Sequence, residues 1–259
     1  MDLKAHKDLL RRQFAVQAKA HSKTIQFRRT ENVAPMIDLA KPQRSDRLID
    51  VATGWGFVPL AFAPMVKSVT GVDLTPEMVA LARKIAAERG VKNVEYVEGD
   101  AEDLRFGPGS FEIATSRFTF HHFGDPEKAL FEMKRVLTPD GRIVLYDYLA
   151  ASDEKKAGRH NEIELARDAS HVKMYSDREF HAFFRKTGLE ARGKIITLMK
   201  RHFHHWMAFV DPSDAVLKRT RKLMEESVEG NKAALGIRDR GGELHFTHTC
   251  VVWLLTPKG

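Results

Sequence analysis

The sequence of 259 residues predicts an α/β fold, a doubly wound and mostly parallel sheet with helices on both faces. Three observations indicate this class. Short apolar runs alternate with helical periods between residues 46 and 150, turn-forming glycines and prolines separate them, and 43% of the residues are hydrophobic. The single cysteine, Cys250, cannot form an internal disulfide, so a large apolar core must hold the fold together.

Seven segments have the length and apolar character of strands. We expect most of them to be parallel and the last to close the sheet in the antiparallel direction. In chain order they are residues 47–51, 68–73, 94–97, 111–115, 142–147, 194–199 and 245–255. The tripeptide Pro139-Asp140-Gly141 is expected to break the chain before the fifth strand.

Helices are expected between these strands. Thr75 and Asp125 are each followed by proline, a combination typical of an N-cap and the first helical position. Ser176 and Glu179 have the spacing of a capping box, and the helix that they begin is expected to end at Gly188. Residues 211–242 are charged and have a helical pattern.

We expect one domain with three parts. Residues 46–150 form the ligand-binding core, and residues 151–259 complete the sheet and add helical insertions that cap the substrate side. Residues 1–45 form an N-terminal helical cap. Two interpretations of residues 1–30 stay open: a lid that closes over the ligand edge of the sheet, or a fixed helix that covers an apolar face.

The formal net charge of +7 is unevenly distributed. Residues 1–45 carry a net +6, residues 46–150 a net −4 and residues 151–259 a net +5. The basic ends indicate either an anionic partner or solvated helix faces. No apolar run is long enough for a membrane span, and the charged N-terminus lacks the apolar core of a secretory signal, so a cytoplasmic location is expected.

A glycine-containing loop follows the first strand and predicts a nucleotide-like ligand. Gly54 and Gly56 let the backbone approach a ligand closely before a helix that begins near Pro59. Asp73 ends the second strand, where its carboxylate can accept hydrogen bonds from ribose hydroxyls. The third glycine of the dinucleotide fingerprint is missing, which argues against NAD and FAD.

Four motifs in order resemble the class I S-adenosylmethionine-dependent methyltransferases. They are Asp-x-x-x-Gly-x-Gly at 50–56, Gly-Val-Asp at 71–73, Gly-Asp-Ala-Glu-Asp-Leu at 99–104 and Leu-Thr-Pro-Asp-Gly at 137–141. Phe-His-His-Phe at 120–123 is similar to the branch that includes the ubiquinone/menaquinone biosynthesis C-methyltransferases. The resemblance covers residues 46–150 well. It implies a Rossmann-like fold, S-adenosylmethionine as the cofactor and S-adenosylhomocysteine as the product.

The resemblance also implies roles for individual residues. The expected cofactor contacts are made by Asp50, Thr53, Gly54 and Gly56 around methionine, by Asp73 at the ribose, by Leu74, Met78, Asp100 and Ala101 at the adenine, and by Ser116 and Arg117 near the methionyl amine. Ala52 stands where the family often has glycine, and Trp55 is bulky for this loop.

Methyl transfer from a sulfonium mainly requires orientation, and a general base adds to the rate. His121 and His122 follow the fourth strand, and we expect one of them to be that base. Tyr175 and Tyr148 are weaker candidates. No metal is predicted, because the histidines at 202–205 have no carboxylate or thiol at a helpful spacing. The predicted apolar substrate wall consists of Phe14, Phe27, Phe118, Phe203 and Trp206.

The expected acceptor is a small molecule, anionic or aromatic, that is methylated at O, C or N. A nucleic-acid methyltransferase or binding protein is the alternative that the high pI of about 9.4 suggests. Against it, Ser116-Arg117-Phe118-Thr119 replaces the Asn/Asp-Pro-Pro-aromatic turn of amino-methylating enzymes, and Cys250 lies away from the cofactor edge. A catalytically silent binding module is the third possibility.

Overall fold

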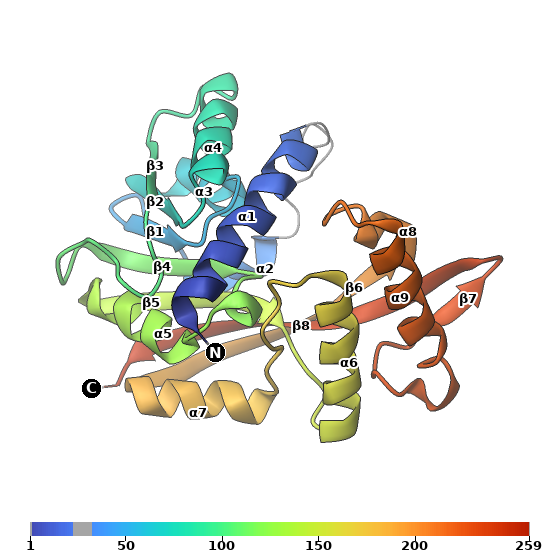
Figure 1. Ribbon diagram of the computed structural model, residues 1–259. Coiled ribbons are helices and arrows are strands. Elements are labelled where there is room, and N and C mark those ends of the chain that lie inside the picture. Colours follow the sequence, from blue (N-terminus) through green and yellow to red (C-terminus); the bar gives the residue numbers. More distant parts are fainter. Residues whose placement is uncertain (1, 23–32, 259) are drawn as a thin grey trace.

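The computed structural model describes residues 2–22 and 33–258, without the side chains of residues 19–22. It has the predicted α/β architecture (Figure 1). The strands are β1 (Arg47–Val51), β2 (Ser68–Asp73), β3 (Val94–Glu98), β4 (Phe111–Arg117), β5 (Leu137–Tyr148), β6 (Leu189–His202), β7 (Arg238–Arg240) and β8 (Glu243–Pro257). They form one sheet of order β3-β2-β1-β4-β5-β8-β6, with β7 paired to β8.

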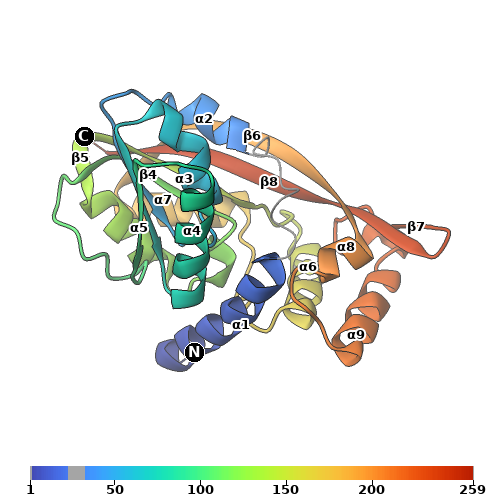
Figure 2. The same cartoon turned by 90° about the horizontal axis from the view of Figure 1, so that it is seen from above.

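The first five strands are parallel, whereas β8 is antiparallel to both β5 and β6. The expected antiparallel closing strand is therefore confirmed. The short β7, in a segment expected to be helical, adds an eighth strand to the predicted seven. Both β6 and β8 are longer than predicted, and Figure 2 shows the pair extending well beyond the parallel strands.

The expected break before the fifth strand is wrong, because residues 139–141 lie within β5. Leu137 of β5 lies opposite Phe111 of β4, and the next partners are Arg142 and Ile113. The four residues 138–141 therefore bulge against a single residue of β4. A bulge accommodates Pro139, since the missing N–H is then not needed for a ladder hydrogen bond.

The helices largely follow the expected boundaries. They are α1 (Leu3–Ser22), α2 (Ala34–Ala40), α3 (Phe57–Phe62), α4 (Pro76–Glu88), α5 (Pro126–Arg135), α6 (Glu154–Arg167), α7 (Asp177–Thr187), α8 (Phe203–Met207) and α9 (Asp214–Glu225), with short 3₁₀ turns η3 (Ala63–Met65), η4 (Phe120–His122) and η5 (Glu229–Asn231). Asp125 caps α5, and the predicted capping box begins α7. Thr75 occupies the N-cap position of α4, but its side chain makes no capping hydrogen bond.

Alternate strand residues supply two apolar cores, one on each face of the sheet. Leu48 and Val144 pack with α2 and α3 on one face. Ile49 and Leu145 pack with α5 and α7 on the other. A third core joins α6, α8 and α9 to the far end of β8 and includes Trp206. This helical cap, formed by residues 151–167 and 203–246, therefore stands on the long strands beside the carboxyl ends of the parallel ones (Figures 1 and 2).

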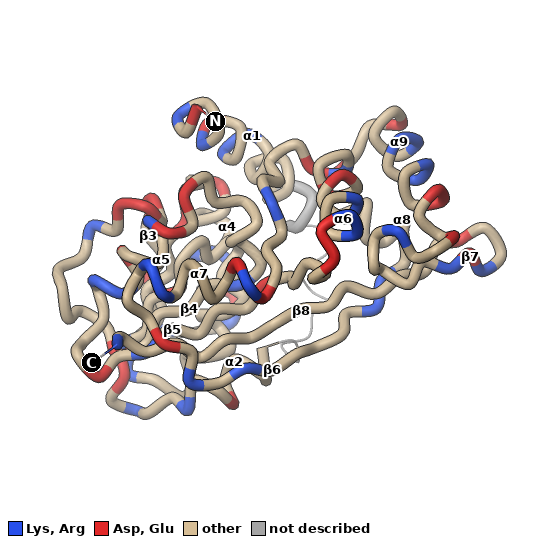
Figure 3. The backbone as a smooth tube through the Cα atoms, turned by 90° about the horizontal axis from the view of Figure 1, so that it is seen from below, with Lys and Arg blue, Asp and Glu red and all other residues tan. Residues whose placement is uncertain are grey.

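Charged side chains of both signs alternate along the helical additions. Figure 3 shows Lys and Arg mixed with Asp and Glu along α1, α6 and α9. Several of these side chains pair within one helix, as Arg221 does with Glu225 at 2.8 Å. This pattern is that of solvated helix faces rather than of one basic surface. Among the helices that the structure describes, none is long and apolar enough to cross a membrane.

Candidate active site

A cavity of about 1020 Å³ lies at the carboxyl ends of the parallel strands. The strand order reverses between β1 and β4, and open α/β sheets bind ligands at such a switch point. Residues after β1, β2 and β3, together with α1, form one half of the wall. The other half comes from residues after β4, from the end of β5, from β6 and from the cap helices α6 and α8.

The loop after β1 has an unusual backbone. Ala52, Gly54 and Gly56 have positive φ angles of 57°, 55° and 83°. A Cβ atom on Gly56 would lie 2.4 Å from the hydroxyl oxygen of Tyr96, and one on Gly71 would lie 2.6 Å from Cδ1 of the same ring. One buried tyrosine therefore explains why both motifs carry glycine at these positions. Ala52 adopts a conformation that favours glycine, which accounts for the glycine that the family often has there.

Two buried carboxylates stand beside this loop. Asp73 accepts hydrogen bonds from the backbone N–H of Gly54 at 2.7 Å and of Thr75 at 2.9 Å. Each of its oxygens keeps a second lone pair that a ligand hydroxyl can use. Asp50 accepts a hydrogen bond from the Thr115 hydroxyl at 2.7 Å, and burial raises the pKa of Asp50 to about 7. Both carboxylates line the cavity.

Helix α1 lies against this half of the cavity. Lys7 Nζ is 2.7 Å from Asp100 Oδ2 and 2.7 Å from Glu102 Oε2. His6 Nε2 donates a hydrogen bond to the carbonyl oxygen of His122 at 2.8 Å. Together with Phe14, these contacts place α1 where a lid is expected. Movement of α1 stays a prediction, and residues 23–32 of the proposed lid lie outside the described residues.

His121 is held by a carboxylate. Its Nδ1 lies 2.7 Å from Oδ1 of Asp147, a residue that is 1% exposed at the end of β5. Burial lowers the pKa of His121, but the charge and hydrogen bond of Asp147 outweigh this effect and raise it. Because the carboxylate engages Nδ1, the other ring nitrogen of His121 is the one available to accept a proton in the cavity.

His122 has a different environment. Its Nδ1 donates to the carbonyl oxygen of Ser170 at 3.0 Å, and burial together with the charge of His121 lowers its pKa to about 4. A third imidazole, His171, lies 5.7 Å from His121 between ring centroids, and burial lowers its pKa to about 3. All three stay buried, but only His121 has a carboxylate partner. The sequence left His121 and His122 as equal candidates, and Asp147 distinguishes them.

The structure brings most of the predicted site residues to the cavity wall. These are Asp50, Thr53, Gly54, Asp73, Leu74, Asp100, Ala101, Arg117, His121 and His122, with Phe14, Phe118 and Trp206 of the predicted aromatic wall. Phe203 is buried in the cap core, and Phe27 lies outside the described residues.

Four predicted residues do not line the cavity. Gly56 packs on Tyr96, and Met78 is buried inside α4. The Ser116 hydroxyl donates to the carbonyl oxygen of Val51 at 3.0 Å and so joins β4 to β1. Tyr175 packs into the sheet core with the phenylalanines of α7. These side chains support the site from behind instead of forming its surface.

Sequence reasoning missed the cap residues of the wall. Arg167 and Asp168 come from α6 and its C-terminal end, and Arg201 comes from β6. No local motif marks these residues, since they reach the cavity only because the cap folds back over the sheet edge. The Asp147 carboxylate could have been found, because Asp147 lies at the carboxyl end of a predicted strand, as Asp50 and Asp73 do.

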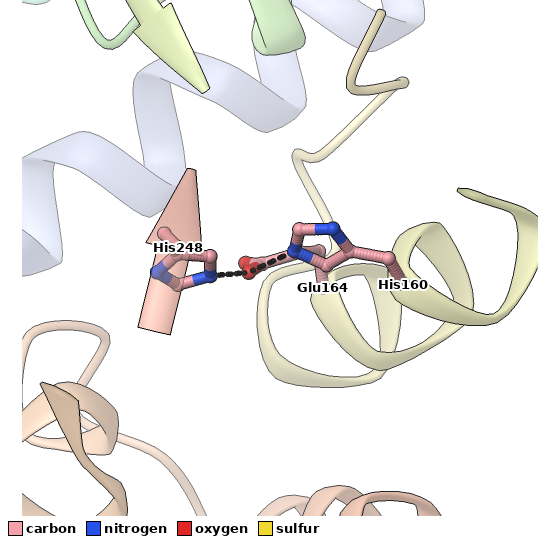
Figure 4. A group of neighbouring side chains, drawn as sticks. All are labelled: His160, Glu164 and His248. Carbon is pink, nitrogen blue, oxygen red and sulfur yellow. Dashed lines mark hydrogen bonds and ion pairs between the residues drawn. The ribbon is translucent and has the colours of Figure 1, made fainter. Parts of the chain in front are cut away.

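A buried group of possible metal ligands lies behind the cap wall (Figure 4). Candidate ligand atoms of His160, Glu164 and His248 all lie within 4.8 Å of one another. His248 Nε2 already donates to Glu164 Oε1 at 2.9 Å, and Arg167 Nη1 lies 3.6 Å from the other carboxylate oxygen. Burial opposes ionisation of Glu164, but these partners hold its pKa well below the usual value. The residue types could hold a divalent metal, yet the carboxylate is satisfied without one and anchors Arg167 at the cavity.

Two other expectations concern metal and thiol chemistry. The histidines at 202–205 do have a carboxylate neighbour, because Glu243 of β8 hydrogen-bonds His204 on the surface. Glu243 is far from these histidines in the sequence, so their spacing could not reveal it, and the absence of a metal stays a prediction. Cys250 is buried in β8, where burial raises the pKa of its thiol to about 12. It does not line the cavity, so it offers no thiolate there.

Comparisons with known proteins agree with this arrangement. Residues 49–145 match the methyltransferase domain family. The uncharacterized methyltransferase YcgJ of Bacillus subtilis is 39% identical over 171 residues, which are 66% of this chain and 68% of YcgJ. The crystal structure of YcgJ has a TM-score of 0.82 at 29% identity, and the alignment covers 89% of this chain and all of YcgJ.

A second relative has a named activity. The demethylmenaquinone methyltransferase of Thermus thermophilus is 42% identical over 115 residues. The match covers 43% of this chain and 51% of that enzyme, so the chain matches about half the length of this relative.

Proposed function

The chain belongs to the class I methyltransferase family, and from this premise we propose that it transfers a methyl group from S-adenosylmethionine to a small-molecule acceptor. The observation that carries the proposal is the position of Asp73 and the loop at 52–56 on one wall of the cavity. Asp73 ends β2, and its carboxylate oxygens each keep a lone pair for a ribose hydroxyl.

The charge of this half of the cavity suits the cofactor. Asp50, Asp73, Asp100 and Glu102 line it against a single lysine, Lys7. S-adenosylmethionine supplies a methyl group on a positively charged sulfur, and a carboxylate-rich wall attracts such a ligand. Asp100 and Ala101 would then face the adenine, Leu74 would pack on it, and Thr53 and Gly54 would lie beside the methionine part.

His121 is the proposed general base. S-adenosylmethionine would supply the methyl group and leave as the neutral thioether, and His121 would take the proton that the acceptor atom loses as it bonds to the methyl carbon. Asp147 then stabilises the imidazolium that results, as a buried carboxylate at 2.7 Å can do. The named relative is a demethylmenaquinone methyltransferase, and an acceptor with an ionisable hydroxyl or carbon acid suits this base.

Calorimetric titration tests the cofactor proposal. The full-length chain should bind S-adenosylmethionine and S-adenosylhomocysteine and should not bind NAD. Asp73→Asn should weaken binding by about 10- to 100-fold, because a charge-assisted hydrogen bond to the ribose contributes about 1.5 to 3 kcal/mol. Glu98→Gln is the matched control, since Glu98 ends the neighbouring strand, is exposed and does not line the cavity.

Two results would count against the proposal. Failure of the chain to bind either cofactor form at millimolar concentration would refute the cofactor proposal. Equal affinity of the Asp73→Asn and Glu98→Gln variants would show that Asp73 is only a strand end. Release of S-adenosylhomocysteine in a labelled-methyl screen of phenols, quinone precursors, amines and carboxylates then separates an enzyme from a silent binding module.

A further inference from the structure

The charges on the cavity wall are divided by sign. The half formed by the loops after β1, β2 and β3 carries the four carboxylates named above and Lys7. The half nearer the cap carries three arginines, Arg117, Arg167 and Arg201, with one exposed lysine and Asp168. The acceptor would occupy this second half if the cofactor occupies the first, so the inference rests on the proposed function.

Arg117 is the most unusual of these cations. Its guanidinium carbon lies 4.5 Å from the ring centre of Phe118 and 4.9 Å from that of Phe57. Among the described residues its Nε has no hydrogen-bond partner and no carboxylate forms an ion pair with it. Aromatic faces compensate a buried cation only in part, because they replace little of its hydration. Burial accordingly lowers the pKa of Arg117.

The backbone at this point is also strained. Phe118 has a φ of 54°, in the left-handed region that a bulky aromatic residue rarely occupies. Its ring stacks on Tyr148 at 4.7 Å with an interplanar angle of 25°. Strained backbone of this kind is typical of ligand-binding positions. The turn places a cation and a flat apolar surface side by side at the wall.

Arg201 and Arg167 approach the same region from the cap side. Arg201 Nη2 donates to the Tyr148 hydroxyl at 3.4 Å, a long hydrogen bond, and its Nε has no partner among the described residues. Arg167 is held by Glu164 and by the carbonyl oxygen of Trp206 at 3.3 Å, and its Nε is likewise without a partner in the described part of the chain. Three arginines on three elements thus line one cavity, and the buried Nε of each lacks a hydrogen-bond partner among the described residues.

We propose that this half of the cavity is a subsite for an oxyanion carried by a flat, apolar methyl acceptor. Arg117, Arg201 and Arg167 bind the carboxylate or phosphate of the acceptor around the Tyr148 hydroxyl, and the apolar body of the acceptor packs against the part of Phe118 that lines the cavity. Arginine forks match both oxyanions with paired hydrogen bonds, and an anion here compensates the charges of Arg117 and Arg201, for which the described residues supply no ion pair.

The test uses the full-length chain saturated with S-adenosylhomocysteine and three probes of one shape: 1-naphthoate, 1-naphthyl phosphate and the neutral 1-naphthamide. We expect both acids to bind at least 10-fold more tightly than the amide, and the tighter acid identifies which oxyanion the subsite prefers. Arg201→Gln should weaken acid binding by about 10- to 100-fold and leave the amide unchanged. The affinity of Arg201→Lys for the acids should lie between those of the wild type and Arg201→Gln, because lysine keeps the charge but lacks the paired donors of the guanidinium.

Arg192→Gln is the matched control, because Arg192 lies on the same strand, is exposed and pairs with Glu190 outside the cavity. Its affinity for the acids should equal that of the wild type. An unchanged affinity of Arg201→Gln for S-adenosylhomocysteine shows that this variant is folded. Arg117→Gln should also weaken binding of the acids. If this variant instead loses cofactor binding and keeps full acid binding, Arg117 belongs to the cofactor site and not to the subsite.

Equal binding of acids and amide, or equal effects of Arg201→Gln and Arg192→Gln, would overturn the subsite while S-adenosylhomocysteine still binds. Failure of both acids to bind at millimolar concentration would do the same. If S-adenosylhomocysteine itself does not bind, the proposed function fails. The acids are then titrated alone, and a preference for them that Arg201→Gln removes would still support the anion subsite.

Discussion

Replacement of Asp147 by asparagine is the most informative single change at the candidate base. The variant keeps the size of the side chain and the acceptor for the backbone N–H of Tyr148, which Asp147 Oδ1 binds at 2.7 Å. It removes the negative charge that lies 2.7 Å from Nδ1 of His121 in a buried setting. Because Oδ1 of Asp147 makes both contacts, an asparagine that keeps its oxygen there still accepts from Nδ1 but without the negative charge. If the amide turned its nitrogen to Nδ1 instead, the variant would lose the acceptor for Tyr148 and place the imidazole proton on the nitrogen that should accept one.

The expected magnitude follows from this contact. A charge-assisted hydrogen bond contributes about 1.5 to 3 kcal/mol, and losing that much stabilisation of the imidazolium lowers kcat by about 10- to 160-fold. The pKa of His121 should fall, because the raising contribution of Asp147 is gone. If His121 is the base, the acid limb of the rate profile then moves to lower pH while the plateau rate decreases.

Stability should change with pH in a defined direction. A histidine whose folded pKa is raised stabilises the native state below its unfolded pKa, and this contribution is lost as pH rises through the folded pKa. The wild type should therefore exceed the Asp147→Asn variant in free energy of unfolding by more at pH 5.5 than at pH 8. Urea unfolding at both pH values measures this difference without any need for the acceptor.

An NMR titration of the histidine side chains reports the pKa of His121 directly. Asp140→Asn is the control, since Asp140 is exposed on the same strand and lies outside the cavity. An unchanged His121 pKa together with an unchanged kcat in the Asp147→Asn variant would refute the assignment of this pair.

Three further changes test the loop and the N-terminal helix. Ala52→Gly should raise the free energy of unfolding by up to about 1 kcal/mol, because it relieves a positive φ of 57°; a decrease in urea unfolding would contradict this. Gly56→Ala should lower it by about 2 kcal/mol or more, since the new Cβ would lie 2.4 Å from the tyrosine hydroxyl beneath the loop. Gly109→Ala is the control, because Gly109 also has a positive φ but has open space around it, so this variant should lower the free energy of unfolding by less. Lys7→Met removes the two ion pairs that join α1 to Asp100 and Glu102 and should speed the hydrogen exchange of α1, whereas replacement of the exposed Lys4 by Met should not. Exchange in α1 that S-adenosylhomocysteine leaves unchanged would rule out a lid.

Local sequence patterns determined the elements and the loop of the first half of the site. The strands at 47–51 and 68–73 and the caps at Asp125 and Ser176 depend on neighbours within a few residues, and the structure confirms them. Asp73 and Gly54 are 19 residues apart, but parallel neighbouring strands end at the same edge, so their proximity follows from the pattern, whereas the hydrogen bond between them is seen only in the structure.

Only the tertiary structure decided which histidine is held by a buried carboxylate and which charged side chains line the half of the cavity nearer the cap. His121 and Asp147 are 26 residues apart and lie at the ends of different segments, and no periodicity distinguishes His121 from His122. Arg117, Arg167 and Arg201 converge because the cap packs on strands that extend past the sheet, a contact between distant segments. Whether a segment forms a helix or a strand depends mainly on neighbouring residues, so the fold and the loop after β1 could be predicted. The direction and pairing of a side chain depend on the packing of residues far apart in the sequence, so the half of the cavity nearer the cap could not be predicted.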